Sequence, residues 1–100
     1  MKQKTVEISF DPQLAASFLD IMSNPVRLRI LICVSQSERD VGSLASETGV
    51  SQSALSQHLA KLRSARMVAT RREKQQIYYK LSESKVMPVL WMLESLFAER

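Results

Sequence analysis

The stretch VGSLASETGVSQSALSQHL, from Val41 to Leu59, says most about the fold of this chain. Apolar residues recur at helical spacing on both sides of Gly49, and this glycine stands where the chain must turn sharply. Two helices joined by such a turn form a helix-turn-helix, which we expect over residues 41–64. The inward stripe of the two helices consists of Val41, Leu44, Ala45, Leu55, Leu59 and Leu62.

The outward face of the second helix is small and polar, whereas an ordinary solvated face would be richer in Glu and Lys. With Leu55 at the centre of the buried side, helical geometry places on and beside the opposite side Ser53, Ser56, Gln57, Ala60, Lys61 and Ser64. Small side chains allow close approach to base edges in a major groove, and a Gln amide can donate and accept as adenine's edge requires. The predicted base-reading residues are Gln52, Ser53, Ser56 and Gln57. The alternative is a helical hairpin that binds nothing.

Positive charge is concentrated directly after this helix. Residues 61–80 carry seven Lys or Arg residues and one acid, Glu73, for a net charge of +6, whereas the whole chain is +4. The rest of the chain is therefore negative on balance. Such asymmetry indicates a polyanionic partner.

Two short strands are predicted in the same stretch, over residues 67–70 and 77–81, joined by a charged tip of residues 71–76. A helix-turn-helix followed by a β-hairpin is a winged helix, whose second helix enters the major groove while the wing, here residues 67–81, reaches the flanking backbone or minor groove. A solvated hairpin with incidental charge is the alternative. The residues expected to contact the DNA backbone or to act through the wing are Ser51, Lys61, Arg63, Arg71, Arg72, Lys74 and Gln75.

Proline follows a capping residue at two places, and each pair marks the start of a helix. Asp11 precedes a first helix over residues 12–22, and Asn24 precedes a second helix over residues 25–35. A polar loop is expected over residues 35–40. Two basic side chains of the second helix can face outward, Arg27 and Arg29.

The last helix, over residues 83–98 with Ser82 or Ser84 as its cap, carries apolar residues on two adjacent stripes. A chain of 100 residues can hardly cover so wide an apolar surface, so we expect the first helix (12–22) and the last to form a homodimer contact. The alternative is that the whole surface packs within one monomer. The expected dimer residues are Leu14, Phe18, Val89, Leu93, Leu96 and Phe97.

Length and composition predict one small domain over residues 1–100, since 45% of the residues are hydrophobic. The expected fold class is mainly α with a small β-hairpin: a dimeric winged helix-turn-helix with about five helices and a two-stranded wing. No apolar run approaches the roughly 18 residues of a membrane span. The opening MKQKTVEISFDP lacks the apolar core of a signal peptide, so we expect a cytoplasmic protein with no membrane partner.

Several longer phrases of the sequence are specific in combination. They are MSNPVRLRIL at 22–31, VGSLA at 41–45, SQSALSQHLAKLR at 51–63, and TRRE at 70–73 with QIYY at 76–79. With these phrases the chain resembles the ArsR/SmtB family of bacterial winged-helix repressors over nearly its whole length. The resemblance implies a homodimer held by the first and last helices, which binds an imperfect inverted repeat at a promoter and usually represses it.

The chain departs from the metal-sensing members of that family. Arsenic and cadmium sensors carry Cys-Val-Cys at the start of the third helix, where this chain has Asp40, Val41 and Gly42. Zinc and nickel sensors carry Asp and His ligands on the last helix, whereas the only acids of residues 82–100 are Glu83, Glu94 and Glu99. Because borderline metals prefer imidazole or thiolate ligands, we expect no metal site and no cofactor.

The chain has one cysteine and one histidine. Cys33 lies in an apolar run, where a buried thiol behaves as a small hydrophobe, with redox or electrophile sensing as the alternative. The family's sulfide- and redox-responding branch has a second cysteine near the end of the last helix, where this chain has Ala98, so a dithiol switch within one subunit is excluded. A bond between the Cys33 residues of two subunits, or modification of the thiol, remains open. His58 is expected at the edge of the core or at the DNA backbone rather than on a metal.

The leading hypothesis is a sequence-specific transcriptional regulator, a repressor that binds double-stranded DNA as a homodimer. The alternative is a winged-helix module that binds an acidic protein, but protein interfaces favour aromatic and Met anchors, which the face of the second helix lacks. An enzyme is the weakest option, because the sequence offers no glycine-rich phosphate loop and only Ser56 with His58 as a nucleophile and base. The operator, the regulated gene and any small-molecule or redox inducer are unknown.

Overall fold

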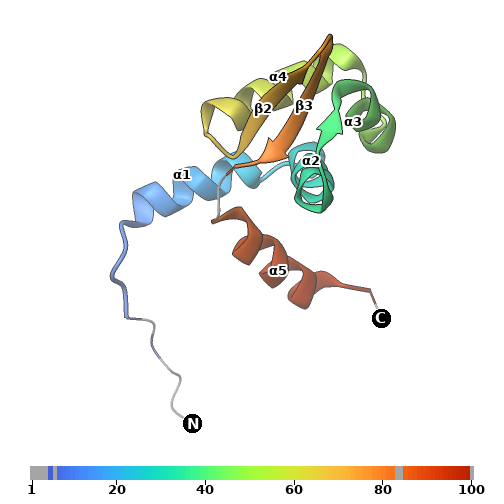
Figure 1. Cartoon of the computed structure of the whole chain (residues 1–100). Coiled ribbons are helices and arrows are strands. Elements are labelled where there is room, and N and C mark those ends of the chain that lie inside the picture. The colour runs from blue at the N-terminus through green and yellow to red at the C-terminus, as the bar shows by residue number, and fades with distance from the viewer. Residues whose placement is uncertain (1–4, 6, 83–84, 100) are drawn as a thin grey trace.

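The computed structural model describes residues 5, 7–82 and 85–99, which form five helices and a three-stranded antiparallel sheet (Figure 1). The elements in chain order are α1 (Pro12–Met22), α2 (Pro25–Gln36), β1 (Arg39–Asp40), α3 (Val41–Thr48), α4 (Gln52–Ser64), β2 (Val68–Glu73), β3 (Gln76–Leu81) and α5 (Val86–Phe97). This order confirms the predicted winged helix, with α3 and α4 as its helix-turn-helix. Among the described residues, every helix is too short or too polar to span a bilayer.

The first two helices begin at the predicted caps. The Asp11 carboxylate accepts a hydrogen bond from the N–H of Gln13 at 2.9 Å. The Asn24 side chain accepts from the N–H groups of Val26 and Arg27 at 2.9 and 3.1 Å. Each cap satisfies backbone donors that have no partner within the helix, and the proline that follows each cap is preset for the first turn.

The sharp turn between α3 and α4 is made by Gly49, whose φ of 73° lies in the left-handed region, where a side chain would be strained. Both helices are capped. The Asp40 carboxylate accepts from the N–H of Ser43 at 2.8 Å, and the Ser51 hydroxyl accepts from the N–H of Ala54 at 3.2 Å. The hydrogen bonds from Ser43 also lower the pKa of Asp40, because they stabilise its charged form.

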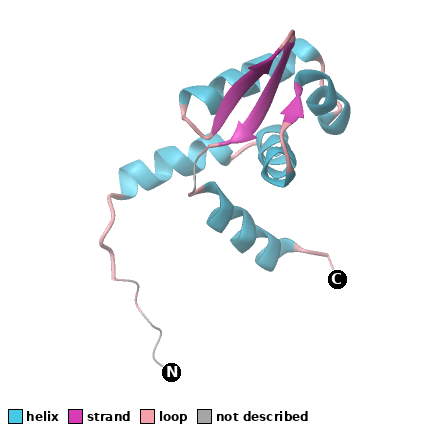
Figure 2. Cartoon of the chain, in the orientation of Figure 1, coloured by secondary structure: helices cyan, strands magenta, loops and turns pink. Residues whose placement is uncertain are grey.

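The two strands of the wing (Figure 2) are longer, and the turn between them is tighter, than the sequence predicts. β2 and β3 stay in antiparallel register as far as Glu73 opposite Gln76, so the turn consists of Lys74 and Gln75 alone. The predicted charged tip over residues 71–76 is therefore wrong. Its outer residues continue the strands, because backbone pairing in a hairpin extends past the buried part of the sheet and tolerates polar side chains there.

A third strand, β1, lies within the segment for which the sequence predicts a polar loop. Arg39 pairs with Tyr79 and Asp40 with Tyr78, which gives the sheet the order β1-β3-β2. The predicted two-stranded wing is thus corrected to a three-stranded sheet. A strand of two residues is too short to show alternating polarity, so its pairing is set by the free edge of β3 rather than by its own sequence.

The predicted serine cap of the last helix is wrong for Ser82. The Ser82 hydroxyl donates to the carbonyl oxygen of Arg66 at 2.7 Å, and the Ser82 N–H donates to that of Met67 at 3.0 Å. These bonds fasten the end of β3 to the connection between α4 and β2. α5 begins at Val86, and Ser84 lies outside the described residues.

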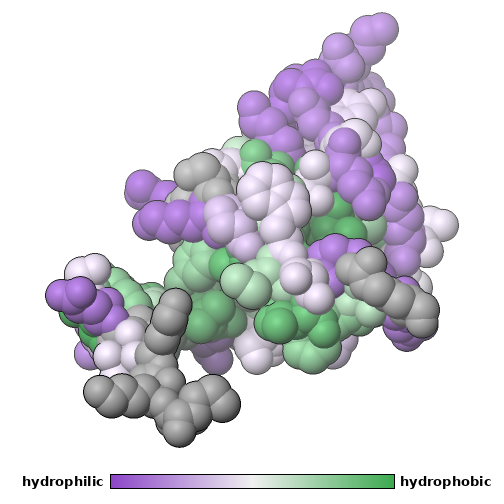
Figure 3. All heavy atoms as spheres, turned by 90° about the horizontal axis from the view of Figure 1, so that it is seen from below, coloured by the Kyte–Doolittle hydropathy of each residue, from purple (hydrophilic) through white to green (hydrophobic). Residues whose placement is uncertain are grey.

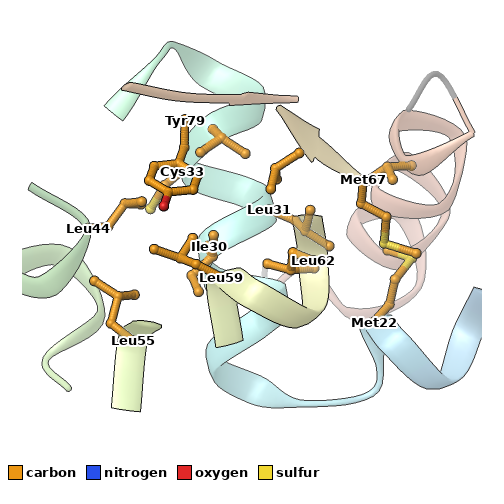
Figure 4. Packing of buried hydrophobic residues seen from close by; sticks show 13 residues of the cluster. Met22, Ile30, Leu31, Cys33, Leu44, Leu55, Leu59, Leu62, Met67 and Tyr79 are labelled. Atoms are coloured by element: carbon orange, nitrogen blue, oxygen red, sulfur yellow. The ribbon is translucent and has the colours of Figure 1, made fainter. Parts of the chain in front are cut away.

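The apolar core lies between α2, α3, α4 and the sheet, which pack against one another (Figure 4). Its buried members are Met22, Ile30, Leu31, Cys33, Val34, Leu44, Leu55, Leu59, Leu62, Met67, Val68, Tyr79 and Val86. Burial of this surface contributes about 25 cal/mol per Å² to folding, and it fixes the orientation of α4 against the rest of the domain.

Candidate nucleic-acid interface

The outer face of α4 carries the four side chains predicted to read bases, and all four are exposed. They are Gln52, Ser53, Ser56 and Gln57. On the opposite side of the helix, Leu55, Leu59 and Leu62 are buried in the core (Figure 4). The helix therefore offers polar groups to a partner and keeps its large apolar side chains inside.

The two ends of α4 carry groups suited to phosphate oxygens. At the start, the Ser51 hydroxyl caps the helix and lies 3.3 Å from the Ser53 hydroxyl. At the end, Lys61 and Arg63 are exposed in the last turn, where a positive charge also interacts favourably with the helix dipole. The ends of α4 can thus contact the backbone on either side of the bases that its middle faces.

The wing exposes the four polar side chains predicted for it, Arg71, Arg72, Lys74 and Gln75. Lys74 and Gln75 form the turn at its end, and Arg72 lies one position before the last pair of β2 and β3. Neither Arg72 nor Lys74 forms an ion pair with a described residue. Their charges are therefore available to a polyanion.

Arg71 differs from the other wing cations because it has partners within the protein. Its Nε donates to Glu38 at 2.9 Å, and its guanidinium lies 4.8 Å from the centre of the Tyr78 ring. Glu73 lies farther off, with 3.7 Å between the charged groups. The hydrogen bond to Glu38 is the largest of the contacts that raise the pKa of Arg71. This pairing has no local signal in the sequence, since Glu38 lies 33 positions before Arg71.

A second ion pair joins the helix-turn-helix to strand β1. Nε of Arg39, on β1, lies 3.0 Å from a carboxylate oxygen of Glu47, on α3. Arg39 also donates to the backbone oxygen and the hydroxyl of Ser37. Sequence reasoning missed this network, because the chain changes direction between the partners and helical spacing cannot reveal them.

Arg27 lies half-buried, whereas the sequence suggests that it can face outward as Arg29 does. Its Nε donates to the carbonyl oxygen of Ile21 at 2.6 Å, and its Nη1 lies 3.3 Å from Nδ1 of His58 on α4. His58 is half-buried at the edge of the core. Burial lowers the pKa of His58, and the positive charges of Arg27 and Lys61 lower it further. The imidazole is therefore neutral at neutral pH and can accept a hydrogen bond.

The residues best suited to redox or metal chemistry do not form a site in the described part of the chain. The Cys33 thiol is buried, with 9% of the residue exposed, as its predicted core position requires. Burial raises the pKa of Cys33, and Glu47 raises it further, so the reactive thiolate is disfavoured. Among residues 5, 7–82 and 85–99, no group of three or more His, Cys, Asp or Glu side chains could hold a metal ion. Sensing by Cys33 stays a hypothesis.

An exposed apolar surface covers α1 and α5, away from the wing. Figure 3, which views the molecule from the side on which α5 lies, shows hydrophobic residues gathered there. Of the predicted dimer residues, Leu14, Leu96 and Phe97 are 70%, 65% and 75% exposed. The other three are half-buried, namely Phe18, Val89 and Leu93.

Two apolar grooves mark this surface. One, of about 620 Å³, lies between α2 and α5 and includes Leu28, Leu93 and Phe97 in its lining. The other, of about 430 Å³, lies between α1 and the start of α5, where Leu14 and Val89 contribute to one wall each. Residues from the two predicted dimer helices are thus brought to one groove, although they are far apart in the sequence.

A helix-turn-helix with a polar reading face, followed by a basic wing, defines a winged-helix DNA-binding regulator of transcription and not an enzyme. The family model described as "Bacterial regulatory protein, arsR family" matches residues 24–70 of the chain. The nodulation protein NolR of Rhizobium meliloti is 47% identical over 89 residues, which are 89% of this chain and 73% of NolR. The chain belongs to the ArsR family.

Two further similarities support this membership. The transcriptional activator HlyU of Vibrio cholerae is 42% identical over 85 residues, which cover 85% of this chain and 79% of HlyU. The crystal structure of the transcriptional repressor BigR from Xylella fastidiosa superposes with a TM-score of 0.83 at 35% identity, and covers 88% of this chain and 90% of BigR. These relatives are named as regulators of both signs. They support DNA binding and give no support to the module that binds an acidic protein.

Proposed function

We propose that this chain is a homodimeric repressor that binds an inverted-repeat DNA site. The observation that carries the proposal is the separation of two surfaces. The exposed polar face of α4 and the basic wing form one, and the exposed apolar side chains of α1 and α5 form the other (Figures 1 and 3). The first surface suits DNA and the second suits another copy of the chain. A two-fold dimer presents two α4 helices, whose symmetry matches an inverted repeat.

In this proposal the middle of α4 reads base edges in the major groove. Gln57 is the side chain best suited to an adenine, because its amide both donates and accepts. Gln52 is exposed as well and offers a second amide, while Ser53 and Ser56 supply shorter polar groups. The small size of Ser53 and Ser56 lets the helix backbone approach the bases closely.

The contacts with the DNA backbone come from both sides of that reading face. Ser51, Lys61 and Arg63 approach phosphates from the ends of α4, and the cations of the wing approach the flanking phosphates or minor groove. Arg72 and Lys74 act without giving up an ion pair to a described residue. Arg71 must exchange its contact with Glu38 for one with DNA.

The dimer contact is proposed on α1 and α5, because these two helices hold most of the large exposed apolar side chains of the described residues. Regulation by repression is supported by the name of the BigR structure. HlyU is named an activator, and activation is therefore the alternative sign of regulation. The proposed place of action is the bacterial cytoplasm, where the chromosome lies.

The test is selection of the highest-affinity duplex from a random library by the wild-type protein, followed by footprinting of that duplex. We expect two half-sites about one helical turn apart, related by inversion, with affinity that falls steeply as salt rises. If the chain were instead a module that binds an acidic protein, the selection would enrich no DNA sequence. Enrichment of a single unrepeated site would contradict the dimer, and absence of any enrichment would contradict the DNA-binding proposal itself.

A further inference from the structure

One side chain connects three helices beside the reading face. Arg27, on α2, donates through Nε to the carbonyl oxygen of Ile21 in the last turn of α1, at 2.6 Å. Its Nη1 lies 3.3 Å from Nδ1 of His58, on α4. His58 directly follows Gln57 in the sequence, and Gln57 is exposed on the proposed reading face.

The α1 end of this bridge has a specific chemical reason. The carbonyl oxygen of Ile21 lies in the last turn of α1, where carbonyls have no N–H partner within the helix, and the residue four positions later is Pro25, which has no N–H. The Arg27 guanidinium supplies the missing donor. The base of Arg27 is itself held, because its backbone N–H donates to the Asn24 cap at 3.1 Å. Arg27 is thus held at its backbone N–H and at its Nε, while its Nη1 reaches His58 on α4.

We propose that Arg27 is a positioning residue for DNA reading, which couples α1 to the recognition helix α4 through neutral His58. The inference rests on the proposed function, since α1 is a proposed dimer helix and α4 the proposed reader. By this route the arrangement of α1 sets the position of Gln57 relative to the bases. Loss of the bridge changes the preference for the correct sequence more than the general attraction to DNA.

The bridge requires His58 to be neutral. A charged guanidinium donates well to a neutral imidazole nitrogen, whereas protonation removes that acceptor and brings two cations together. Burial lowers the pKa of His58 most, and two cations, Arg27 from α2 and Lys61 from α4 itself, lower it further. The neutral form thus prevails at neutral pH, and the bridge is lost as the pH falls through the lowered value. Stability falls in the same direction, because the unfolded chain binds the proton more readily.

A measurement without DNA tests the contact itself. The chain contains one histidine, so the imidazole signals in an NMR titration of the untagged protein belong to His58. We expect Arg27→Ala to raise the pKa of His58, because a nearby positive charge is removed. The matched control is Arg29→Ala, which removes an exposed charge from the same helix and should change the value much less. An equal pKa in wild type and Arg27→Ala would overturn the proposed coupling.

A second measurement tests its effect on reading. The readout is the ratio of affinities for the selected duplex and a scrambled duplex, followed from about pH 7.5 to below the titration midpoint of His58 that the NMR measurement gives. The ratio cancels the general gain in DNA affinity that any added positive charge brings. For wild type we expect the ratio to fall by about tenfold on acidification, which corresponds to about 1.4 kcal/mol.

The variants separate positioning from folding. His58→Asn keeps an acceptor near Nδ1 but cannot titrate, so its ratio should stay near the neutral wild-type value at every pH. Arg27→Lys keeps the charge but has one nitrogen in place of the separate Nε and Nη1 donors that reach Ile21 and His58, so its ratio should be low at every pH. A ratio that is independent of pH in wild type, or unchanged in Arg27→Lys, would overturn the inference. A wild-type ratio near one at every pH would instead overturn the proposed function. The NMR titration would still show whether Arg27 contacts His58.

Discussion

Gln57 is exposed near the middle of α4, and its amide is the group best matched to a base edge. We predict that Gln57→Ala lowers affinity for the selected duplex by roughly 1 to 3 kcal/mol and relaxes the preference at one base pair in each half-site. Affinity for scrambled DNA should hardly change, because no phosphate contact is lost. Competition assays with both duplexes measure the difference, and equal losses on the two would contradict base reading by Gln57.

Lys74 combines a proposed phosphate contact with a strained backbone, since its φ of 58° lies in the left-handed region. We predict that Lys74→Gly raises the free energy of unfolding by roughly 0.5 to 1 kcal/mol, because glycine adopts this conformation without strain. The same change should weaken binding to all duplexes alike and flatten the salt slope by about one unit.

Arg66 provides the matched control for Lys74. Its φ is 60°, it is exposed, and it lies at the end of α4 outside the proposed DNA contacts. Arg66→Gly should therefore stabilise the fold by a similar amount and leave the salt slope nearly unchanged. A salt slope that falls equally in both variants would show that the wing turn has no special role.

At the scale of elements, the wing is fastened to the α2–β1 connection by Arg71 and Glu38, at 2.9 Å. We predict that Glu38→Gln raises affinity for any duplex by about threefold, because Arg71 is released and a negative charge near the DNA is removed. The free energy of unfolding should change by less than about 1 kcal/mol, as for other exposed ion pairs. Weaker binding in Glu38→Gln would mean that the ion pair holds Arg71 in its binding position instead of withholding it.

The elements that can be predicted from this sequence are those with a local signal. The Asp-Pro and Asn-Pro pairs mark the starts of α1 and α2, and Gly49 marks the turn of the helix-turn-helix. β1 could not be predicted, because two residues carry no periodicity and their pairing depends on the edge of β3. The two-residue turn at Lys74 could not be predicted for a related reason. Charged residues indicate that a segment is exposed, but they do not show where the strand pairing ends.

The reading face and the basic wing can likewise be predicted from the sequence pattern. The side-chain contacts that hold them in position cannot. The exposed face of α4 is given by its 3.6-residue period. The contacts from Arg27 to His58 and from Arg71 to Glu38 join residues 31 and 33 positions apart. Such contacts arise from tertiary packing, and the sequence around either residue does not identify its partner. The sequence therefore indicates the reading face and the wing, whereas the contacts that hold them in place are seen only in the structure.

At the scale of the whole molecule, the apolar side chains of α1 and α5 require a partner surface if the proposed dimer is correct. We predict that Phe97→Glu yields monomers, because a charge would be buried in the contact. Phe97 is 75% exposed in the single chain, so its replacement should not unfold the domain. Ser46→Glu, at an exposed position of α3, is the control and should remain dimeric. Sedimentation at micromolar concentration distinguishes the states, and a monomeric wild type would contradict the dimer.

The most direct measurement is the sedimentation mass of the complex that the wild-type protein forms with the selected duplex, titrated against a scrambled duplex in the same buffer. We predict two chains on each selected duplex, bound at least about a thousandfold more tightly than to scrambled DNA. Replacing one half-site by scrambled sequence should remove most of that preference. One chain per duplex, held equally by selected and scrambled DNA, would contradict a homodimer that reads an inverted repeat.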